Sequence, residues 1–226
     1  MRKITASIVI GAALLMSGCA NKDLEEKQSG FLKSYKGLEE DPKFKNIQIA
    51  ITDGIDFSQY NSIMIDDIIV MSGIPKEKQT LKQKQLYKDI SDYLTSHYKE
   101  KVRGSVYNLA EEVAPKTMRY EIAISAVEVH FDDMSWYQYT PITLALTGAA
   151  RSTYSDEAVR ILGEARLVDA QTGEVLMRAR SLQTGEKVTV EADELTFKNV
   201  KPGLDGWLKN TQNNLKTLHN YKKDNK

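Results

Sequence analysis

The sequence predicts a single α+β domain, a mostly antiparallel sheet with two main helices packed on it. Two observations favour this class: segments in which apolar and polar residues alternate, and two long segments of helical periodicity. A third is the length of 226 residues, which suits one domain. The expected order of elements is β-α-β-β-β-β-(β)-α, the bracketed strand being optional.

The first strand and the first helix follow each other closely. Residues 63–71 are apolar except for Asp66 and Asp67, which predicts a central strand covered on both faces. Residues 80–101 then repeat apolar side chains at helical spacing. Thr80 and Gln83 have the spacing of a capping box, and Gly104 follows the last periodic residue.

The remaining strands and the second helix occupy the rest of the domain. A short strand is expected at residues 105–109, followed by a longer one at 119–131 whose apolar residues change phase, predicting a bulge near Ala126. Residues 159–167 and 175–179 alternate around a turn and predict a hairpin. A further strand at 187–191 is the optional one, and Pro202 is expected to open the last helix.

The first nineteen residues resemble the signal segment of a bacterial lipoprotein. Arg2 and Lys3 precede a short apolar run, residues 8–16, which is too short to span a bilayer. Small residues then lead to Cys19, the single cysteine, in the pattern Leu-Met-Ser-Gly-Cys of a lipobox. We therefore expect residues 1–18 to be removed and Cys19 to carry a diacylglycerol thioether and an N-acyl chain such as palmitate.

Residue 20 and the segment after it bear on location. In the sorting pattern that this region resembles, aspartate after the cysteine retains a lipoprotein at the inner membrane, and here the residue is Ala20. The expected location is therefore the outer membrane, with the protein on its periplasmic side. Residues 19–46 are rich in mixed charge and predict a lipidated, flexible tether, within which Phe31, Leu32, Tyr35 and Leu38 are expected to dock on the domain. The folded domain is expected at 47–220 and a polar tail at 221–226.

Composition excludes several classes of function. The formal net charge is zero, and loss of the signal segment removes two cations, so no basic excess is available for binding nucleic acid. A single cysteine excludes an internal disulfide. The sequence contains neither a Gly-x-Ser-x-Gly motif nor a Gly-rich phosphate loop, and its three histidines lack the spacing of a zinc site. We expect no resident cofactor and no enzymatic activity.

The segment after the long central strand holds the remaining candidate residues. His130, Asp132 and Asp133 bring an imidazole and two carboxylates together, which leaves open a metal site or a general base of a periplasmic hydrolase. Residues 132–154 continue with aromatic and then uncharged residues. They either cover the sheet, or form a partner surface centred on Trp136, Tyr137 and Tyr139. In a third alternative, a lipid or small-molecule carrier, residues 141–150 act as a lid.

Several short stretches together resemble the bacterial lipoprotein family catalogued as domain of unknown function 3313. Their order along the chain is the basis of the resemblance. They are Cys19; Ser29-Gly30-Phe31-Leu32 with Tyr35 and Leu38; Asp56-Phe57-Ser58-Gln59-Tyr60 leading into Ile63-Met64-Ile65-Asp66; Asp169 with Thr172-Gly173-Glu174; and Leu204-Asp205-Gly206-Trp207.

The resemblance implies an α+β envelope lipoprotein and supplies no catalytic residue. The function expected from the sequence is therefore a non-enzymatic binding or accessory role at the outer membrane. The expected partner is another envelope protein or a component of the cell wall.

Overall fold

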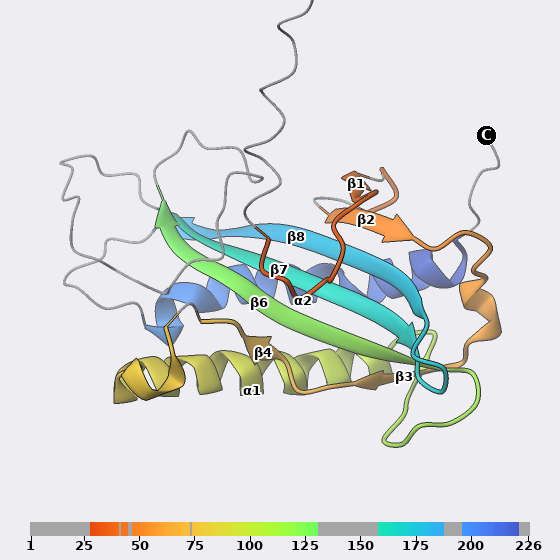
Figure 1. The fold of residues 1–226 in the computed structure, drawn as a ribbon, viewed down its shortest axis with the longest axis horizontal. Coiled ribbons are helices and arrows are strands. Elements are labelled where there is room, and N and C mark those ends of the chain that lie inside the picture. The colour runs from red at the N-terminus through yellow and green to blue at the C-terminus, as the bar shows by residue number, and fades with distance from the viewer. Residues whose placement is uncertain are drawn as a thin grey trace, which may run out of the picture.

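The computed structural model describes residues 28–40, 42–44, 47–72, 74–130, 158–187 and 196–221. For residues 126–130, 158–160 and 184–187 it describes the backbone. These residues form an eight-stranded sheet and two long helices (Figure 1). The predicted α+β class is confirmed. The strands are β1 (Glu39–Glu40), β2 (Ile47–Ile51), β3 (Ser62–Ile65), β4 (Ile69–Val70), β5 (Asn108–Leu109), β6 (Thr117–His130), β7 (Ala158–Asp169) and β8 (Val175–Lys187).

The sheet is mixed. Its order is β1-β2-β8-β7-β6-β3-β5, and β4 also pairs with β6. All neighbours from β1 to β6 in this order are antiparallel, whereas β3 is parallel to both β6 and β5, and β4 is parallel to β6. The prediction of a mostly antiparallel sheet therefore holds for the long strands and misses the parallel pairs at one side.

The predicted strand at residues 63–71 is in fact two short strands, β3 and β4. Between them Ile68 is buried, and its backbone N–H donates to Oγ1 of Thr95 at 2.9 Å while its carbonyl accepts from the Ser91 hydroxyl. Asp66 forms an ion pair with Arg119 of β6, at 2.8 Å. The chain leaves the sheet after Asp66 and Asp67. At Ile68, the hydroxyls of Thr95 and Ser91 take the place of hydrogen bonds to a neighbouring strand. The first strand is also not central, since only β5 lies beyond β3.

The long strands confirm two predictions. The pairing of β6 with β7 shifts register between Ile124 and Ala126, where the phase change predicted a bulge. The strands β7 and β8 form the predicted hairpin, and the Asp169 side chain accepts from the backbone N–H groups of Gln171 and Thr172 in its turn, at 2.9 and 2.8 Å.

The two helices lie on the same face of the sheet (Figure 1). Helix α1 (Leu81–Arg103) has the predicted capping box, in which the Gln83 N–H donates to Oγ1 of Thr80 and the Thr80 N–H donates to the Gln83 side chain. Helix α2 (Phe197–His219) begins five residues before Pro202, so the predicted start was wrong. The Thr196 N–H donates to the Asn199 side chain at 2.9 Å, and this cap starts the helix ahead of the proline.

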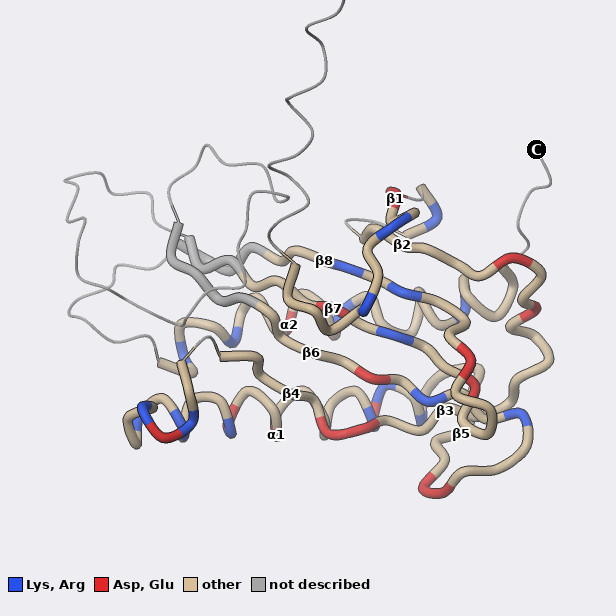
Figure 2. The backbone as a smooth tube through the Cα atoms, in the orientation of Figure 1, with Lys and Arg blue, Asp and Glu red and all other residues tan. Residues whose placement is uncertain are grey.

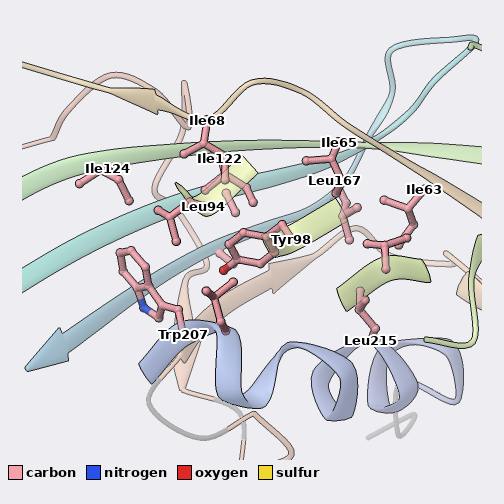
Figure 3. Packing of buried hydrophobic residues seen from close by; sticks show 14 of the residues in the cluster. Ile63, Ile65, Ile68, Leu94, Tyr98, Ile122, Ile124, Leu167, Trp207 and Leu215 are labelled. Carbon is pink, nitrogen blue, oxygen red and sulfur yellow. The ribbon is translucent and has the colours of Figure 1, made fainter. Parts of the chain in front are cut away.

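The core lies between the sheet and the helices (Figure 3). Figure 3 shows Tyr98 and Leu94 of α1 and Trp207 and Leu215 of α2 directed at apolar side chains of β3, β6 and β7. Among the described residues, neither helix has a stretch apolar enough to cross a bilayer.

Candidate functional site

A pocket of about 90 Å³ lies between α2 and the strands β7 and β8. Its floor consists of buried side chains from both helices and the sheet: Tyr98 of α1, Ile122 and Ala165 of the sheet, and Trp207 and Thr211 of α2. Its rim is more exposed, because Asn210 lies on the surface and Gln183 and Asn214 are half-buried. The pocket therefore has a buried base and a solvent-facing mouth.

Two glycines give the pocket its shape. A Cβ on Gly163 would lie 2.6 Å from the Trp207 ring, so the indole can lie on the strand only where the side chain is missing. A Cβ on Gly206 would lie 2.9 Å from Oε1 of Gln183. The Trp207 Nε1–H donates to the Ser181 hydroxyl at 3.2 Å, which fixes the plane of the ring. The glycines thus permit a close approach of helix and sheet beside the pocket.

On the helical side of the sheet the polar side chains at the pocket are uncharged, whereas Glu164 and Arg180, which also border it, direct their side chains to the opposite face. The side chains of Gln183, Asn210 and Asn214 line it, and within the described part of the chain none of these amides has a hydrogen-bond partner. Two tyrosines complete the lining, with Tyr98 and Tyr120 in edge-on contact at a centroid distance of 6.0 Å. Burial raises the pKa of Tyr120 to about 12 and raises the pKa of Tyr98 further, so both phenols stay neutral near pH 7.

The opposite face of the sheet carries charges. Glu164, Arg166, Arg178 and Arg180 on β7 and β8 and Glu121 on β6 face away from the helices, and Figure 2 shows Lys and Arg along β7 and β8. Arg166 pairs with Glu121, and Nε of Arg180 lies 3.7 Å from Oε1 of Glu164. The side chain of Glu164 is fully buried.

An N-terminal segment covers this charged face, and we call residues 28–38 the strap (Figure 1). The hydroxyls of Ser29 and Tyr35 both donate to Oε2 of Glu164, the latter at 3.2 Å. Burial raises the pKa of Glu164, while the hydrogen bond from Ser29 and the charge of Arg180 oppose that shift.

Further contacts fasten the strap along its length. Arg178 donates to the carbonyls of Ser34 and Lys36, at 2.6 and 3.1 Å, and Leu32 is 2% exposed. The guanidinium of Arg166 lies over the Phe31 ring, 5.2 Å from its centroid. The predicted docking of this apolar set is therefore confirmed for Leu32, Phe31 and Tyr35. Residues 28–40 and 42–44 pack on the domain, where the sequence predicted the end of a flexible tether.

The strap supplies hydrogen bonds to one oxygen of Glu164, Oε2, while Oε1 accepts no hydrogen bond among the described residues. The buried carboxylate of Glu164 lies among two hydroxyls and a guanidinium. We interpret this cluster as a fastening between strap and sheet, and the pocket on the other face as the candidate functional site.

Most of the residues singled out from the sequence lie outside the described residues. These are Cys19, Asp132, Asp133, Trp136, Tyr137 and Tyr139, and of His130 the structure describes only the backbone at the end of β6. The other histidines are far apart: Nδ1 of His97 lies 2.7 Å from the Tyr93 carbonyl, and His219 stacks edge-on against Tyr107. Within the described ranges, no group of three His, Cys, Asp or Glu side chains is placed to hold a metal ion.

Three residues on one side of α2 indicate the pocket from the sequence. Trp207, Asn210 and Asn214 are spaced i, i+3 and i+7 on α2, which places an aromatic ring and two amides along one side of the helix. A helix face on which carboxamides border a tryptophan is a better sign of a polar pocket than of a continuous core.

Comparison with known proteins places this chain beside other proteins without an assigned activity. Residues 27–211 match the family described as protein of unknown function (DUF3313). The uncharacterised lipoprotein YdcL of Escherichia coli is 27% identical over 196 residues, which cover 85% of this chain and 87% of YdcL.

Solved structures resemble the chain more distantly. The PelC dodecamer of Paraburkholderia phytofirmans is 11% identical, with a TM-score of 0.40, over 78% of this chain and 99% of PelC. A DUF4136 family protein of Bacteroides thetaiotaomicron is 14% identical, with a TM-score of 0.41, over 76% of this chain and 96% of that one. At these scores the likenesses carry no argument about function.

Proposed function

Because the chain belongs to the family described as protein of unknown function (DUF3313), which carries no activity to inherit, we propose a function from its own residues. The protein is a lipoprotein, anchored through acyl chains on Cys19 to the periplasmic side of the outer membrane. Its domain binds another envelope component and catalyses no reaction. The expected partner is an envelope protein or a cell-wall component.

The observation that carries the anchor is the sequence around Cys19. A positive start, a short apolar run and small residues precede the single cysteine, and more than one acyl chain on it would give stable membrane attachment. The E. coli relative, which matches over most of both chains, is itself named a lipoprotein. Ala20 in place of aspartate supports the outer rather than the inner membrane.

The binding role is supported by the chemistry of the described pocket. On the helical side its polar lining consists of amides, neutral phenols and the hydroxyls of Ser181 and Thr211, and no histidine is among the described residues that line it to activate a hydroxyl as a nucleophile. Such groups are suited to holding a ligand by hydrogen bonds and apolar contact.

The docked strap limits how far the domain reaches from the membrane. Residues 20–27 alone join Cys19 to the strap, and at about 3.3–3.6 Å per residue they span about 30 Å when fully extended. The domain therefore works near the lipid surface, and the partner must come within that distance.

Separation of inner and outer membranes on a density gradient tests the location. The natural protein is expected in the outer membrane and the Ala20→Asp variant in the inner membrane, while Cys19→Ala is expected in neither as a lipidated form. An Asn21→Asp variant, which changes charge one residue further on, is the control. An unchanged distribution of Ala20→Asp, or a natural protein in the inner membrane, contradicts the proposed location.

Photocross-linking in living cells tests the binding role. A photoreactive residue at Asn210, at the exposed mouth of the pocket, is expected to give a discrete cross-linked product in envelopes, and the same residue at exposed Lys82 of α1 serves as control. Absence of any product specific to position 210 argues against a partner at this site.

A further inference from the structure

We propose that the pocket between α2 and the strands β7 and β8 binds the ring of a neutral sugar, with Trp207 as its apolar wall and Gln183, Asn210 and Asn214 as hydrogen-bonding groups. This inference names a ligand class for the proposed binding function. It depends on the geometry of the pocket and not on the lipid anchor.

The size of the pocket suits one small ring. One water molecule needs about 10–15 Å³ of such a space, so about 90 Å³ admits a cluster of several waters or a compact ligand of similar bulk. The buried base fixes how deep the ligand can enter, and the mouth at Asn210 leaves room for further units of a chain outside.

The polar lining disfavours charged ligands. Glu164 and Arg180 border the pocket, but Oε1 of Glu164 faces Arg180 and its Oε2 accepts from Ser29 and Tyr35 of the strap. A charge buried in the pocket would meet amides, phenols and hydroxyls, because the side chains of Glu164 and Arg180 face the other side of the sheet, and burying an unpaired charge is costly.

The same lining disfavours wholly apolar ligands. The amides of Gln183, Asn210 and Asn214 have no hydrogen-bond partner within the described part of the chain, so covering them with hydrocarbon would leave them unsatisfied. Burying an unsatisfied polar group costs about 1–3 kcal/mol. A lipid tail is therefore a poor occupant.

A neutral sugar ring meets both requirements. Its hydroxyls donate and accept, as amide side chains do, and its C–H groups make an apolar face that fits against an aromatic ring. Gly163 admits the Trp207 ring against β7, and the Ser181 hydroxyl accepts a hydrogen bond from its indole N–H. These two contacts fix the position of the ring before a ligand binds. Such preorganisation lowers the entropy lost on binding.

Binding is measured on the full-length protein in phospholipid nanodiscs, which contain no sugar detergent. The neutral probes are glucose, N-acetylglucosamine, cellotriose and triacetylchitotriose, and the charged probes are glucuronate and glucosamine. Saturation-transfer NMR detects contact, and Trp emission in a Trp136→Phe background gives the affinity through Trp207. At least one neutral probe is expected to saturate, and the charged probes are expected to bind about tenfold more weakly or not at all.

Matched variants on α2 locate the site. Loss of one amide is expected to weaken binding about fivefold or more in Asn214→Ala and in Asn210→Ala. Asn213→Ala changes the same residue type one position away, on an exposed side that does not line the pocket, and is expected to bind as the natural protein does. Asn210 is exposed, so its variant tests binding without threatening the fold, and thermal unfolding of every variant verifies this.

The proposal is overturned if no neutral probe binds saturably, if a charged probe binds more tightly, or if Asn213→Ala weakens binding as much as Asn214→Ala. None of these results would alter where the Cys19 and Ala20 variants reside in the membranes. Failure of this inference is therefore distinguishable from failure of the anchor.

Discussion

Gly163 determines how closely α2 approaches the sheet. Any Cβ at this position of β7 would lie 2.6 Å from two carbons of the six-membered ring of Trp207. By sequence alone, a glycine within a strand indicates a locally destabilised strand or a β-bulge. The close approach could not be predicted, because it depends on a residue more than forty positions away in a different element.

Replacement of Gly163 by alanine tests this contact. We expect Gly163→Ala to lower the free energy of unfolding by about 1–3 kcal/mol, because the added methyl forces the indole off the strand. Chemical denaturation provides the measurement. In a Trp207→Phe background, where the far ring is missing, the same change is expected to cost much less. An equal cost in both backgrounds would show that the clash is not the cause.

Asp169 is a second residue whose role is local and testable. Backbone N–H groups of Thr172 and Gln171 hold the pKa of its carboxyl below the usual range, with the Tyr60 hydroxyl donating to Oδ2 at 3.1 Å. A lowered pKa means that the unfolded chain binds the proton more readily. The carboxylate therefore contributes stability above the unfolded pKa of about 3.9, and this is lost as the pH falls through the folded value.

Asp169→Asn is expected to remove this dependence on pH. At pH 7 the variant loses about 1 kcal/mol, a modest figure because the carboxylate is partly exposed and water screens its charge. At pH 3 the difference from the natural protein is expected to shrink. Denaturant unfolding at both pH values measures it, with exposed Asp67→Asn as the control. A difference that stays constant with pH would contradict the account.

At the scale of elements, the strap shows where sequence patterns were informative and where they were not. The spacing of Phe31, Leu32 and Tyr35 predicted docking. The docking surface could not be predicted, because Glu164 and the arginines of β8 come together only when β7 and β8 pair. In an alternating strand, the sequence pattern of Glu164 is that of a solvent-exposed residue, although its side chain is buried. The strap residue Tyr35 that contacts it lies more than a hundred positions earlier in the chain.

The hydrogen bond between Tyr35 and Glu164 tests whether the strap is fastened as described. Tyr35→Phe removes the hydroxyl and keeps the ring, and we expect faster amide exchange across residues 28–38 and a loss of about 1–2 kcal/mol. Glu164→Gln is expected to act through the same contact, so a double-mutant cycle should give a coupling energy of about 1 kcal/mol. The exposed Lys36→Ala serves as control. Additive effects would indicate that the two side chains do not interact.

The remaining elements divide in the same way. The cap of α1, the bulge in β6 and the turn of the hairpin were predicted because each is encoded within a few adjacent residues. The break between β3 and β4 was not, because it depends on Ser91 and Thr95 of a helix that follows later. The early start of α2 was missed because the Thr196–Asn199 cap was given less weight than Pro202.

For the whole molecule, the α+β class followed from local periodicity, whereas the parallel pairing of β3 and β4 with β6 is a matter of topology that periodicity does not encode. The sequence also left open a functional segment at residues 130–139, most of which lies outside the described residues. The described site is the pocket on the helical face. It draws on α1, α2 and the sheet, and no single stretch of sequence contains it.

The strap and the pocket lie on opposite faces of the sheet. One face is covered by the strap (Figure 1), and the pocket lies on the other face, beneath α2. The strap and the pocket are therefore separated by the thickness of the sheet, so a ligand in the pocket would not compete with the strap.

Mass spectrometry of the mature N-terminus tests the acylation of Cys19. The natural protein, recovered from the membrane fraction, is expected to begin at Cys19 and to carry the mass of a diacylglycerol thioether and an N-acyl chain. The contradicting result is a full-length polypeptide, recovered from the cytosol, that begins at Met1 and has a free thiol at residue 19.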